Sequence, residues 1–413
     1  MKSKIAFYPT IFSLFGAFFA FFMVYAENVG VSKYLVEHVP WLVINNIDTA
    51  RVILTTFIAG LISIMVFSFS MVMILLNQAS SNFSPRVLPG LISNRRHQYI
   101  LGIYNACLLY CIFTLITIEP TGDTYQLPGF SVLLSILFMT TCLGAFIYFV
   151  HSISQEIQVG TILSKIFLKA KNRLSYLLEH ENQDFEMEDT NEWIILNSME
   201  TGYFQDANFP YLRNICETND LKIETLLIKG SFVLKGNAIL KINKSIDDEL
   251  IEDIYDALKF SKGELIEENY VLAFKQITEV AVKAMSPGIN DPGTAINAID
   301  YLTELFRLRL KKRDTSVYRN DDGHPIIFIK SLNFETLMYS VMASLRTYCK
   351  NDVLLIRKLF QMLSALSIAE EHAEPQYKNI IMSEMESLLY DAKQNINNEK
   401  DLIMIEKLYD KSK

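Results

Sequence analysis

The sequence predicts an α-helical membrane domain of four transmembrane helices, followed by an α+β cytosolic domain that combines a small β subdomain with a helical C-terminal part. Two observations lead to this fold class. Residues 1–150 hold only seven of the 38 Lys and Arg and five of the 46 Asp and Glu of the 413-residue chain, and they contain four uncharged apolar runs. The rest of the chain carries 31 basic and 41 acidic residues and alternates between β-like and amphipathic patterns.

Each apolar run is about as long as the ~20 residues that a helix needs to cross the hydrocarbon core of a membrane. The runs cover residues 5–26, 52–76, 99–118 and 129–150. The first run exceeds the roughly 7–15 apolar residues of a signal peptide, and no A-x-A-like cleavage site follows it. We therefore expect the first run to be retained as a transmembrane helix.

Lys and Arg are distributed unevenly over the segments that join these runs. The segment between the second and third runs and the segment after the fourth run are basic, whereas residues 119–128 contain no Lys or Arg. The positive-inside rule therefore predicts that both termini lie in the cytoplasm. The basic residues concerned are Arg86, Arg95, Arg96, Lys165, Lys169, Lys171 and Arg173.

The predicted boundaries divide the chain into four parts. Residues 1–152 form the transmembrane domain, residues 153–192 a stalk helix with an acidic linker, residues 193–243 the small β subdomain, and residues 244–413 the mainly helical cytosolic domain. The β subdomain is predicted from short apolar alternations that Lys-Gly and Gly-Asn turn signals separate. Helices are predicted again from Ser245, which starts a capping-box-like pattern, and apolar residues at helical spacing follow over 265–286.

The second span carries small and polar residues at a regular spacing. Thr56, Ser63, Ser70 and Asn77 recur every seven residues, with Gly60 on the same side, so they form one stripe along the helix. The stripe extends over about 31 Å at ~1.5 Å per residue, which matches the thickness of the bilayer core. Small residues allow close contact between helices. The alternative is that the stripe lines a water-filled path when several copies assemble.

The segment AMSPGINDPGTAINAID at residues 284–300 interrupts two helical stretches with turn-forming residues. Gly288 can take a positive φ, and Asp291 is a good N-cap for a helix that begins with a proline. These features predict a rigid elbow between two helices. A ligand site is the alternative, because a helix N-terminus with free N–H groups can hold an anion. The elbow and ligand candidates are Ser286, Pro287, Gly288, Asn290, Asp291 and Pro292.

A hydrolase that uses Ser286 as its nucleophile is a weaker alternative. A serine nucleophile needs a base within hydrogen-bond distance, and the candidate bases are His324 and His372. No spacing argument brings either histidine close to Ser286. We expect no catalytic residue in this segment.

A second Ser-Pro pair follows the second span. Ser84 and Pro85 can cap a helix that leaves the inner membrane surface, and Arg86 can contact lipid phosphate or an acidic partner. The simpler interpretation is a helix cap next to an arginine that sets the membrane topology. These three residues form the predicted membrane-edge motif.

Composition excludes several classes of function. The acidic part of the chain offers no basic stripe for nucleic acid. No span contains Asp, Glu, Lys or Arg, which argues against a proton-coupled pump. The five cysteines include no C-x-x-C pair, so we expect neither a disulfide framework nor a zinc site. We expect no metal and no cofactor.

Five segments of the chain carry a resemblance to a known family. They are FSPR at 83–86, FVHSISQEIQ at 149–158, TGY at 201–203, GSFVLKG at 230–236 and AMSPGINDPGTA at 284–295. With these segments the chain resembles an uncharacterised family of bacterial membrane proteins, domain of unknown function 2254. This chain has Met285 where the family usually has leucine. It has SKGELIEEN at 261–269 where the family tends to show Arg-Thr and then Gln-Asp, so any role of that arginine does not transfer to this chain. The resemblance implies four spans with a cytosolic domain in the bacterial inner membrane, and it implies no reaction, substrate or catalytic residue.

Two functions are consistent with these patterns. The first is a homo-oligomeric pore in the lipid bilayer, permeable to ions, with the stripe along its path and a cytosolic domain that senses a signal and gates the pore. The second is a membrane-anchored cytosolic sensor or scaffold without conduction, which would bind a partner or a small-molecule ligand. An enzyme is the least consistent class. Neither the permeant species nor the number of subunits follows from the sequence.

Overall fold

The structure is a computed structural model of the whole chain, and it describes residues 7–39, 44, 46–82, 95–118, 128–156, 158–180, 185, 188–261, 269–368 and 375–412. The chain forms two compact units, Met1–Gln158 and Val159–Lys413. Each unit is described by itself.

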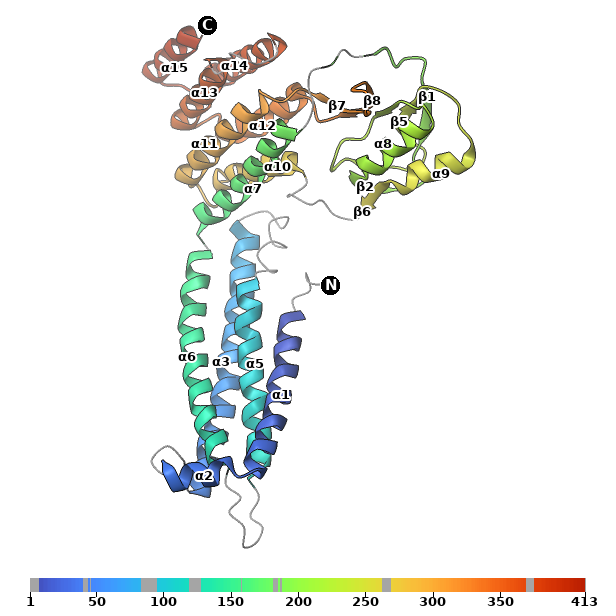
Figure 1. The fold of residues 1–413 in the computed structure, drawn as a ribbon. Coiled ribbons are helices and arrows are strands. Elements are labelled where there is room, and N and C mark those ends of the chain that lie inside the picture. The colour runs from blue at the N-terminus through green and yellow to red at the C-terminus, as the bar shows by residue number, and fades with distance from the viewer. Residues whose placement is uncertain are drawn as a thin grey trace. The chain divides into compact units, whose positions relative to one another are not determined.

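The first unit is built from four long helices that run side by side, with one short helix after the first (Figure 1). All four long helices are long and apolar enough to cross a membrane, as the four apolar runs predict. The third element is the longest, with 36 residues, or about 54 Å at ~1.5 Å per residue. The helices are α1 (Phe7–Asn28), α2 (Val31–His38), α3 (Ile47–Asn82), α5 (Arg95–Ile116) and α6 (Gly129–Glu156).

Small residues bring α1 and α5 into close contact. A Cβ added to Gly16 of α1 would lie 2.4 Å from the carbonyl oxygen of Ala106 of α5. A Cβ added to Gly102 of α5 would lie 2.8 Å from the ring of Phe12. Because lipid tails are as apolar as the side chains, such backbone proximity is a main source of helix association in membranes.

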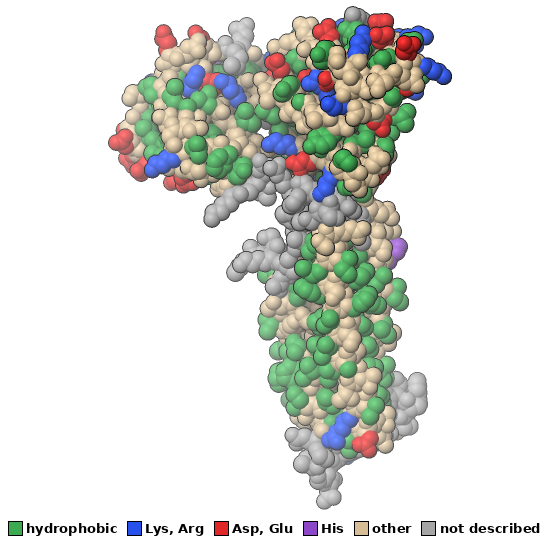
Figure 2. Space-filling model, turned by 180° about the vertical axis from the view of Figure 1, so that it is seen from behind, with side chains coloured by type: hydrophobic (Ala, Val, Ile, Leu, Met, Phe, Trp, Pro, Cys, Tyr) green, Lys and Arg blue, Asp and Glu red, His purple; other side chains and the backbone are tan. Residues whose placement is uncertain are grey.

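The surface of the first unit is apolar. On the face shown in Figure 2, hydrophobic side chains cover the four helices and charged side chains are few. Phe15, Phe18 and Phe21 of α1 are at least 60% exposed, whereas Phe19 packs on Tyr110 and Phe138. An exposed apolar surface of this kind is suited to lipid.

The N-terminus of α6 is capped by side chains from the start of the chain. The backbone and the hydroxyl of Ser131 both donate to Glu27 Oε1, at 2.9 and 2.8 Å. The backbone N–H of Phe130 donates to Ser32 Oγ at 2.9 Å. Gly30 permits this arrangement, because its φ of 97° turns the chain sharply between α1 and α2.

The second unit contains two sheets. A five-stranded sheet has the order β1-β5-β3-β8-β7, in which only the β3–β8 pair is parallel, and a three-stranded antiparallel sheet has the order β4-β2-β6. Two strands thus come from a β-hairpin after residue 310, far beyond the range expected for the β subdomain. The strands are β1 (Ile194–Asn197), β2 (Gly202–Ala207), β3 (Ile223–Thr225), β4 (Phe232–Val233), β5 (Ala238–Ile242), β6 (Leu258–Ser261), β7 (Thr315–Arg319) and β8 (Pro325–Lys330).

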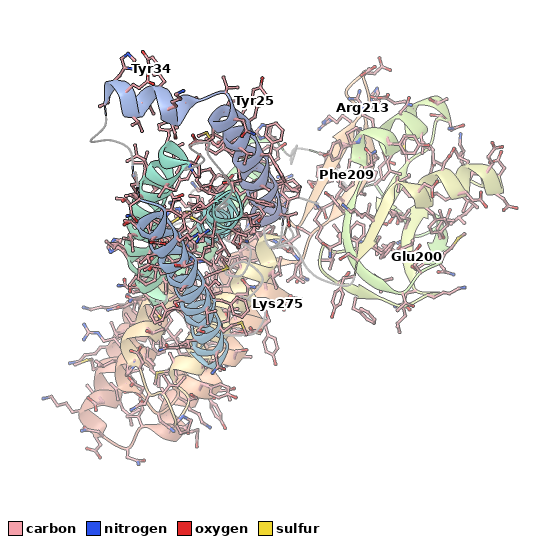
Figure 3. The ribbon with its side chains drawn as sticks, turned by 90° about the horizontal axis from the view of Figure 1, so that it is seen from below. Tyr25, Tyr34, Glu200, Phe209, Arg213 and Lys275 are labelled. Carbon is pink, nitrogen blue, oxygen red and sulfur yellow. The ribbon has the colours of Figure 1, made fainter. Side chains whose placement is uncertain are left out.

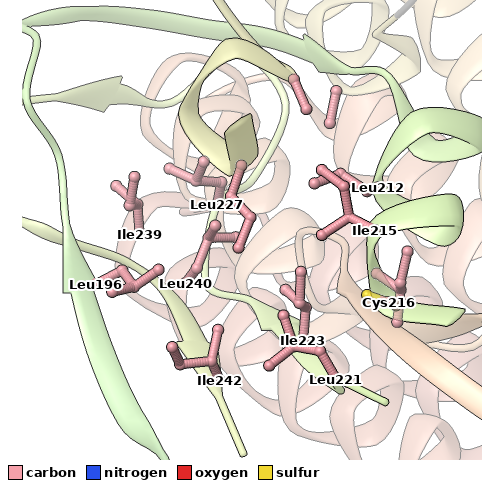
Figure 4. Close-up of a cluster of buried hydrophobic side chains, with 14 of the residues drawn as sticks. Leu196, Leu212, Ile215, Cys216, Leu221, Ile223, Leu227, Ile239, Leu240 and Ile242 are labelled. Atoms are coloured by element: carbon pink, nitrogen blue, oxygen red, sulfur yellow. The ribbon is translucent and has the colours of Figure 1, made fainter. Parts of the chain in front are cut away.

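The sheets pack against helices α8 (Phe209–Thr218) and α9 (Asp248–Asp256) around one apolar core. Figure 4 shows how side chains of α8 meet those of the central strands in this core. Ile223, Ile239 and Leu240 are fully buried. Burial of this kind stabilises the β part by roughly 25 cal/mol per Å² of apolar surface removed from water.

The other helices of the second unit form a second layer. The chain enters it through α7 (Val159–His180), which was expected to be a stalk but packs on α10 and α11. The physical reason is the apolar side of α7, which includes Ile162, Ile166 and Leu174, all at most 6% exposed. The further helices are α10 (Tyr270–Ala284), α11 (Pro292–Arg309), α12 (Phe334–Cys349), α13 (Val353–Ile368), α14 (Pro375–Asn395) and α15 (Glu399–Ser412).

Candidate functional site

The polar stripe of the second span lies on α3, on the side that faces away from the core of the first unit. The core side of α3 carries Leu54, Leu61 and Leu75, each at most 2% exposed. Three stripe residues each follow one of these leucines by two positions. Positions i and i+2 are about 200° apart around an α-helix, so the stripe lies opposite the core side. The four exposed stripe residues are Thr56, Ser63, Ser70 and Asn77.

Gly60 lies at the edge of this stripe, because it follows Thr56 by one helical turn and is offset from it by about 40° around α3. It is half-buried, and a Cβ at this position would lie 3.5 Å from Met139 Cε of α6. Gly60 therefore contributes to the packing between α3 and α6, while the exposed stripe consists of the three hydroxyl residues and Asn77.

The stripe hydroxyls bond to their own helix. Each donates to the backbone carbonyl four residues earlier, so its hydrogen is satisfied without a neighbouring helix. The bonds are Thr56 Oγ1 to Val52 O at 2.7 Å, Ser63 Oγ to Ala59 O at 2.9 Å, and Ser70 Oγ to Val66 O at 2.9 Å. The oxygen lone pairs remain available to a partner.

The interior of the helical bundle is filled by large side chains. Leu54, Leu61, Tyr104 and Phe149 are completely buried. Among the described helices the stripe therefore has no counterpart inside the subunit, and a path along the stripe would have to lie between copies of the chain.

The predicted elbow joins α10 to α11. Asp291 is the N-cap of α11: its carboxylate accepts the backbone N–H of Thr294 at 3.1 Å and the hydroxyl of Thr294 at 2.6 Å. These hydrogen bonds lower the pKa of Asp291 below its ordinary value. The left-handed residue of the elbow is Asn290, with φ 48°, and Gly288, where a positive φ was expected, does not adopt one. Asparagine tolerates this conformation because its short polar side chain bonds locally.

The elbow offers little chemistry of its own. Ser286 Oγ donates to the carbonyl of Lys283 at 2.7 Å, which caps the end of α10. Pro287 is exposed and Pro292 is the first residue of α11. Of the two candidate bases, His324 lies in the β7–β8 hairpin and His372 lies outside the described residues. The described part of the chain contains no cluster of three or more His, Cys, Asp or Glu that could hold a metal.

The membrane-edge motif Ser84, Pro85 and Arg86 lies outside the described residues.

A cavity of about 290 Å³ lies in the second unit, and no sequence motif indicated it. Its walls come from the C-terminal half of α7, the start of α8, the N-terminus of α10 and the strands β2, β7 and β8. Figure 3 labels Phe209, which forms part of the wall at the start of α8. The residues belong to six separate stretches of sequence, so only the folded chain brings them together. The volume is at the lower end of the range for small-molecule pockets.

Comparison with known proteins settles the family. The sequence profile of the DUF2254 family of predicted membrane proteins matches residues 2–365 of the chain. This chain belongs to the DUF2254 family. Relatives include an uncharacterized protein of Mycobacterium bovis and two uncharacterized proteins of Mycobacterium tuberculosis, each 22% identical over 373 residues, which cover 86% of this chain and 70% of the relative. No solved structure matches the chain.

Two of the segments that resemble the DUF2254 family are neighbours in the structure. Gly202 and Tyr203 of β2 pair with Val233 and Phe232 of β4. The segment GSFVLKG starts and ends with glycines in the left-handed region, Gly230 at φ 83° and Gly236 at φ 91°. Lys229, just before this segment, lines the cavity. The matching segment 230–236 thus adjoins the cavity but supplies none of its lining residues.

Proposed function

We propose that this DUF2254 protein assembles in the membrane through the exposed side of α3, and that an ion-conducting path lies between the copies. The observation that carries the proposal is the position of Thr56, Ser63, Ser70 and Asn77 on the outside of the subunit. Small and hydroxyl-bearing residues favour close contact between transmembrane helices. Their oxygen lone pairs can also contact water or an ion along a shared axis.

In this proposal the second unit lies in the cytosol and regulates the path. The basic segments after the second and fourth spans support a cytosolic position for both chain termini. The filled interior of each bundle supports a path between subunits over a path through one subunit. The pore is passive in this proposal, because the four apolar runs contain no Asp, Glu, Lys or Arg that could take part in proton coupling.

Assembly through α3 is tested by disulfide cross-linking in native membranes. All five cysteines are buried, so a new exposed cysteine reacts selectively. Ser63→Cys should give cross-linked dimers on oxidation. Ile147→Cys places a cysteine on α6 at a position that is 71% exposed, and it should give none. Equal cross-linking of the two variants would contradict a specific α3 interface.

Conduction is tested with purified protein in liposomes. Replacing both Ser63 and Ser70 by leucine should remove the ion flux, because two branched apolar side chains displace the polar edge of the path. The matched control is the double replacement of Thr140 and Thr141 on α6, which are exposed and bond to their own helix in the same way. A flux that both variants leave unchanged would eliminate the stripe as a conduction path.

A membrane-anchored sensor or scaffold without conduction is the second candidate. It is favoured by the hydroxyl bonds within α3, because a satisfied hydroxyl is also stable in a dry helix–helix contact. This candidate predicts cross-linking through Ser63→Cys together with no flux above that of empty liposomes. The two experiments thus separate the candidates.

A further inference from the structure

The cavity of the second unit is basic although the part of the chain that contains it is acidic. Residues after position 150 carry ten more acidic than basic side chains. In the described part of the chain, the charged side chains that line the cavity are nevertheless four basic residues and one carboxylate, that of Asp206. The four basic residues are Arg173, Lys229, Lys312 and Lys330. Such a concentration of positive charge inside an acidic unit favours an anionic ligand.

Arg173 is the basic residue with unused hydrogen-bonding capacity. Among the described residues it forms no ion pair, and its Nε is buried without a hydrogen-bond acceptor. Its guanidinium lies over the ring of Tyr176, 5.4 Å from the centroid. A buried donor without an acceptor is destabilising, and more so when the donor is charged. A guanidinium is also the side chain best suited to bind a phosphate through two hydrogen bonds.

The N-terminus of α10 adds to the positive potential. Asn269, the N-cap residue, accepts the backbone N–H of Val271 at 3.0 Å and donates to the carbonyl of Lys229 at 2.9 Å. Asn269, Tyr270 and Val271 all line the cavity. The N-terminus of a helix stabilises a bound anion through its dipole and its free N–H groups. Three independent features therefore favour negative charge here: the lysines, Arg173 and this helix end.

Two aromatic pairs form the apolar part of the wall. Phe209 and Tyr318 are stacked, with ring centroids 5.0 Å apart and an interplanar angle of 12°. Tyr176 and His180 are stacked at 4.1 Å and 15°. All four rings line the cavity. Planar apolar walls beside basic groups suit a ligand that has a flat ring system at one end and a phosphate at the other.

We infer that this cavity binds a nucleoside monophosphate, with the phosphate near Arg173 and the base against the aromatic pairs. The volume fits a mononucleotide better than a dinucleotide cofactor. The site is independent of conduction, because every residue that lines it belongs to the second unit. It would make the second unit a nucleotide sensor in either of the two proposed functions.

Two variants change the charge of the cavity in opposite directions. Arg173→Gln removes the unpaired cation, and it should weaken nucleotide binding about tenfold or more. Asp206→Asn removes the one carboxylate that lines the cavity among the described residues, and this carboxylate pairs with Lys229 at 2.5 Å. Lys229 would then be free for the ligand, so the affinity should rise by about three- to tenfold. A gain in affinity cannot result from misfolding, so the second variant protects the test against a folding defect.

The experiment is isothermal titration calorimetry of the full-length protein in detergent with AMP, GMP, CMP and UMP, and with adenosine and inorganic phosphate as separate probes. We expect at least one nucleotide to bind about tenfold or more tightly than adenosine or phosphate, and its affinity to fall as salt is added. Arg307→Gln is the matched control, because Arg307 is exposed on α11 and does not line the cavity. It should leave the affinity unchanged.

Three results would overturn the inference. One is the absence of binding by all four nucleotides. Another is an affinity for inorganic phosphate equal to that for the best nucleotide, because the aromatic walls would then contribute nothing. The third is an unchanged affinity in both Arg173→Gln and Asp206→Asn, because the ligand would then lie elsewhere.

Discussion

Glu224, at the centre of the five-stranded sheet, is predicted to stabilise the second unit in a pH-dependent manner. It lies on β3 and is 1% exposed. Its carboxylate pairs with Lys330 of β8 at 2.6 Å and with Lys241 of β5 at 3.4 Å, and it accepts the hydroxyl of Thr190 at 2.6 Å. The carboxylate thus connects both strands that flank β3. Removal of these partners would leave a buried charge without compensation, which strongly destabilises a fold.

Glu224→Gln tests this arrangement with almost no change in volume. The amide can still accept from Thr190, but both ion pairs are lost. The Lys330 side chain is 40% exposed and can return to water, whereas the Lys241 side chain is 18% exposed and keeps Thr190 as its remaining acceptor. Loss of one well-buried charge interaction and one half-exposed interaction should lower the free energy of unfolding by about 2–3 kcal/mol at pH 7.

The effect should depend on pH with a defined sign. Burial raises the pKa of Glu224, but the hydrogen bonds from Lys330 and Thr190 and the charges of the two lysines lower it, and the net result is a pKa below the ordinary 4.5. A carboxyl whose folded pKa is depressed contributes its full stability above its unfolded pKa. That contribution is lost as the pH falls below about 4.5 and through the folded pKa. The difference between the two proteins should therefore shrink at acid pH.

The assay is urea unfolding of the full-length protein in detergent, followed by the fluorescence of Trp193. This side chain lies 6.0 Å from the ring of Phe328 on β8 and reports on the sheet. Trp41 is the only other tryptophan, so a Trp41→Phe background isolates the signal. The control Glu200→Gln removes an exposed carboxylate and should change the stability by less than about 0.5 kcal/mol. A loss for Glu224→Gln that is equal at pH 7 and pH 4 would refute the reasoning.

Two further predictions concern the elbow and the helical bundle. Asp291→Ala removes the N-cap of α11 and should lower the free energy of unfolding by about 0.5–2 kcal/mol in the same urea assay. Asp291→Asn keeps a hydrogen-bond acceptor and should lower it much less. Equal losses of stability in the two variants would show that the cap is unimportant. Gly16→Ala places a methyl group against the backbone of Ala106, so it should lower the thermal midpoint of the protein in detergent, consistent with about 1–3 kcal/mol of overpacking. Ala17→Leu is the control on the same helix, and a greater loss for it than for Gly16→Ala would contradict the close contact of α1 and α5.

The four membrane helices were predictable because their signal is local. A run of about 20 uncharged apolar residues identifies a helix that can cross a bilayer, whatever surrounds it. The sequence was less informative about which side of α3 faces the core of the bundle and which side faces outward. The seven-residue repeat correctly groups Ser63 with Ser70, but only the packing of Leu61 against the bundle shows that this group faces outward.

The β part and the cavity were predictable only in part, because they depend on contacts between distant segments. Turn signals predicted the strands between residues 193 and 243. They could not show that β8, about a hundred residues later, lies parallel to β3. The elbow shows a smaller failure of the same kind. Both Gly288 and Asn290 can adopt a positive φ. In the structure Asn290 is the residue in the left-handed region, and the backbone N–H of the next residue, Asp291, donates to the carbonyl of Ala284.

The charges around the cavity support its proposed role as a site for an anion. Lys229 and Lys330 are each partly neutralised, by Asp206 and Glu224. An acidic unit could have neutralised Arg173 in the same way at little cost, since a nearby carboxylate stabilises a half-buried guanidinium. Among the described residues no carboxylate does so. A cation kept without its counter-ion beside two aromatic pairs is expected where the counter-ion is the ligand. If conduction is regulated through this site, Arg173→Gln must alter the nucleotide dependence of the flux and leave the Ser63→Cys cross-link intact. If the protein is a sensor without conduction, the same variant must alter nucleotide binding alone.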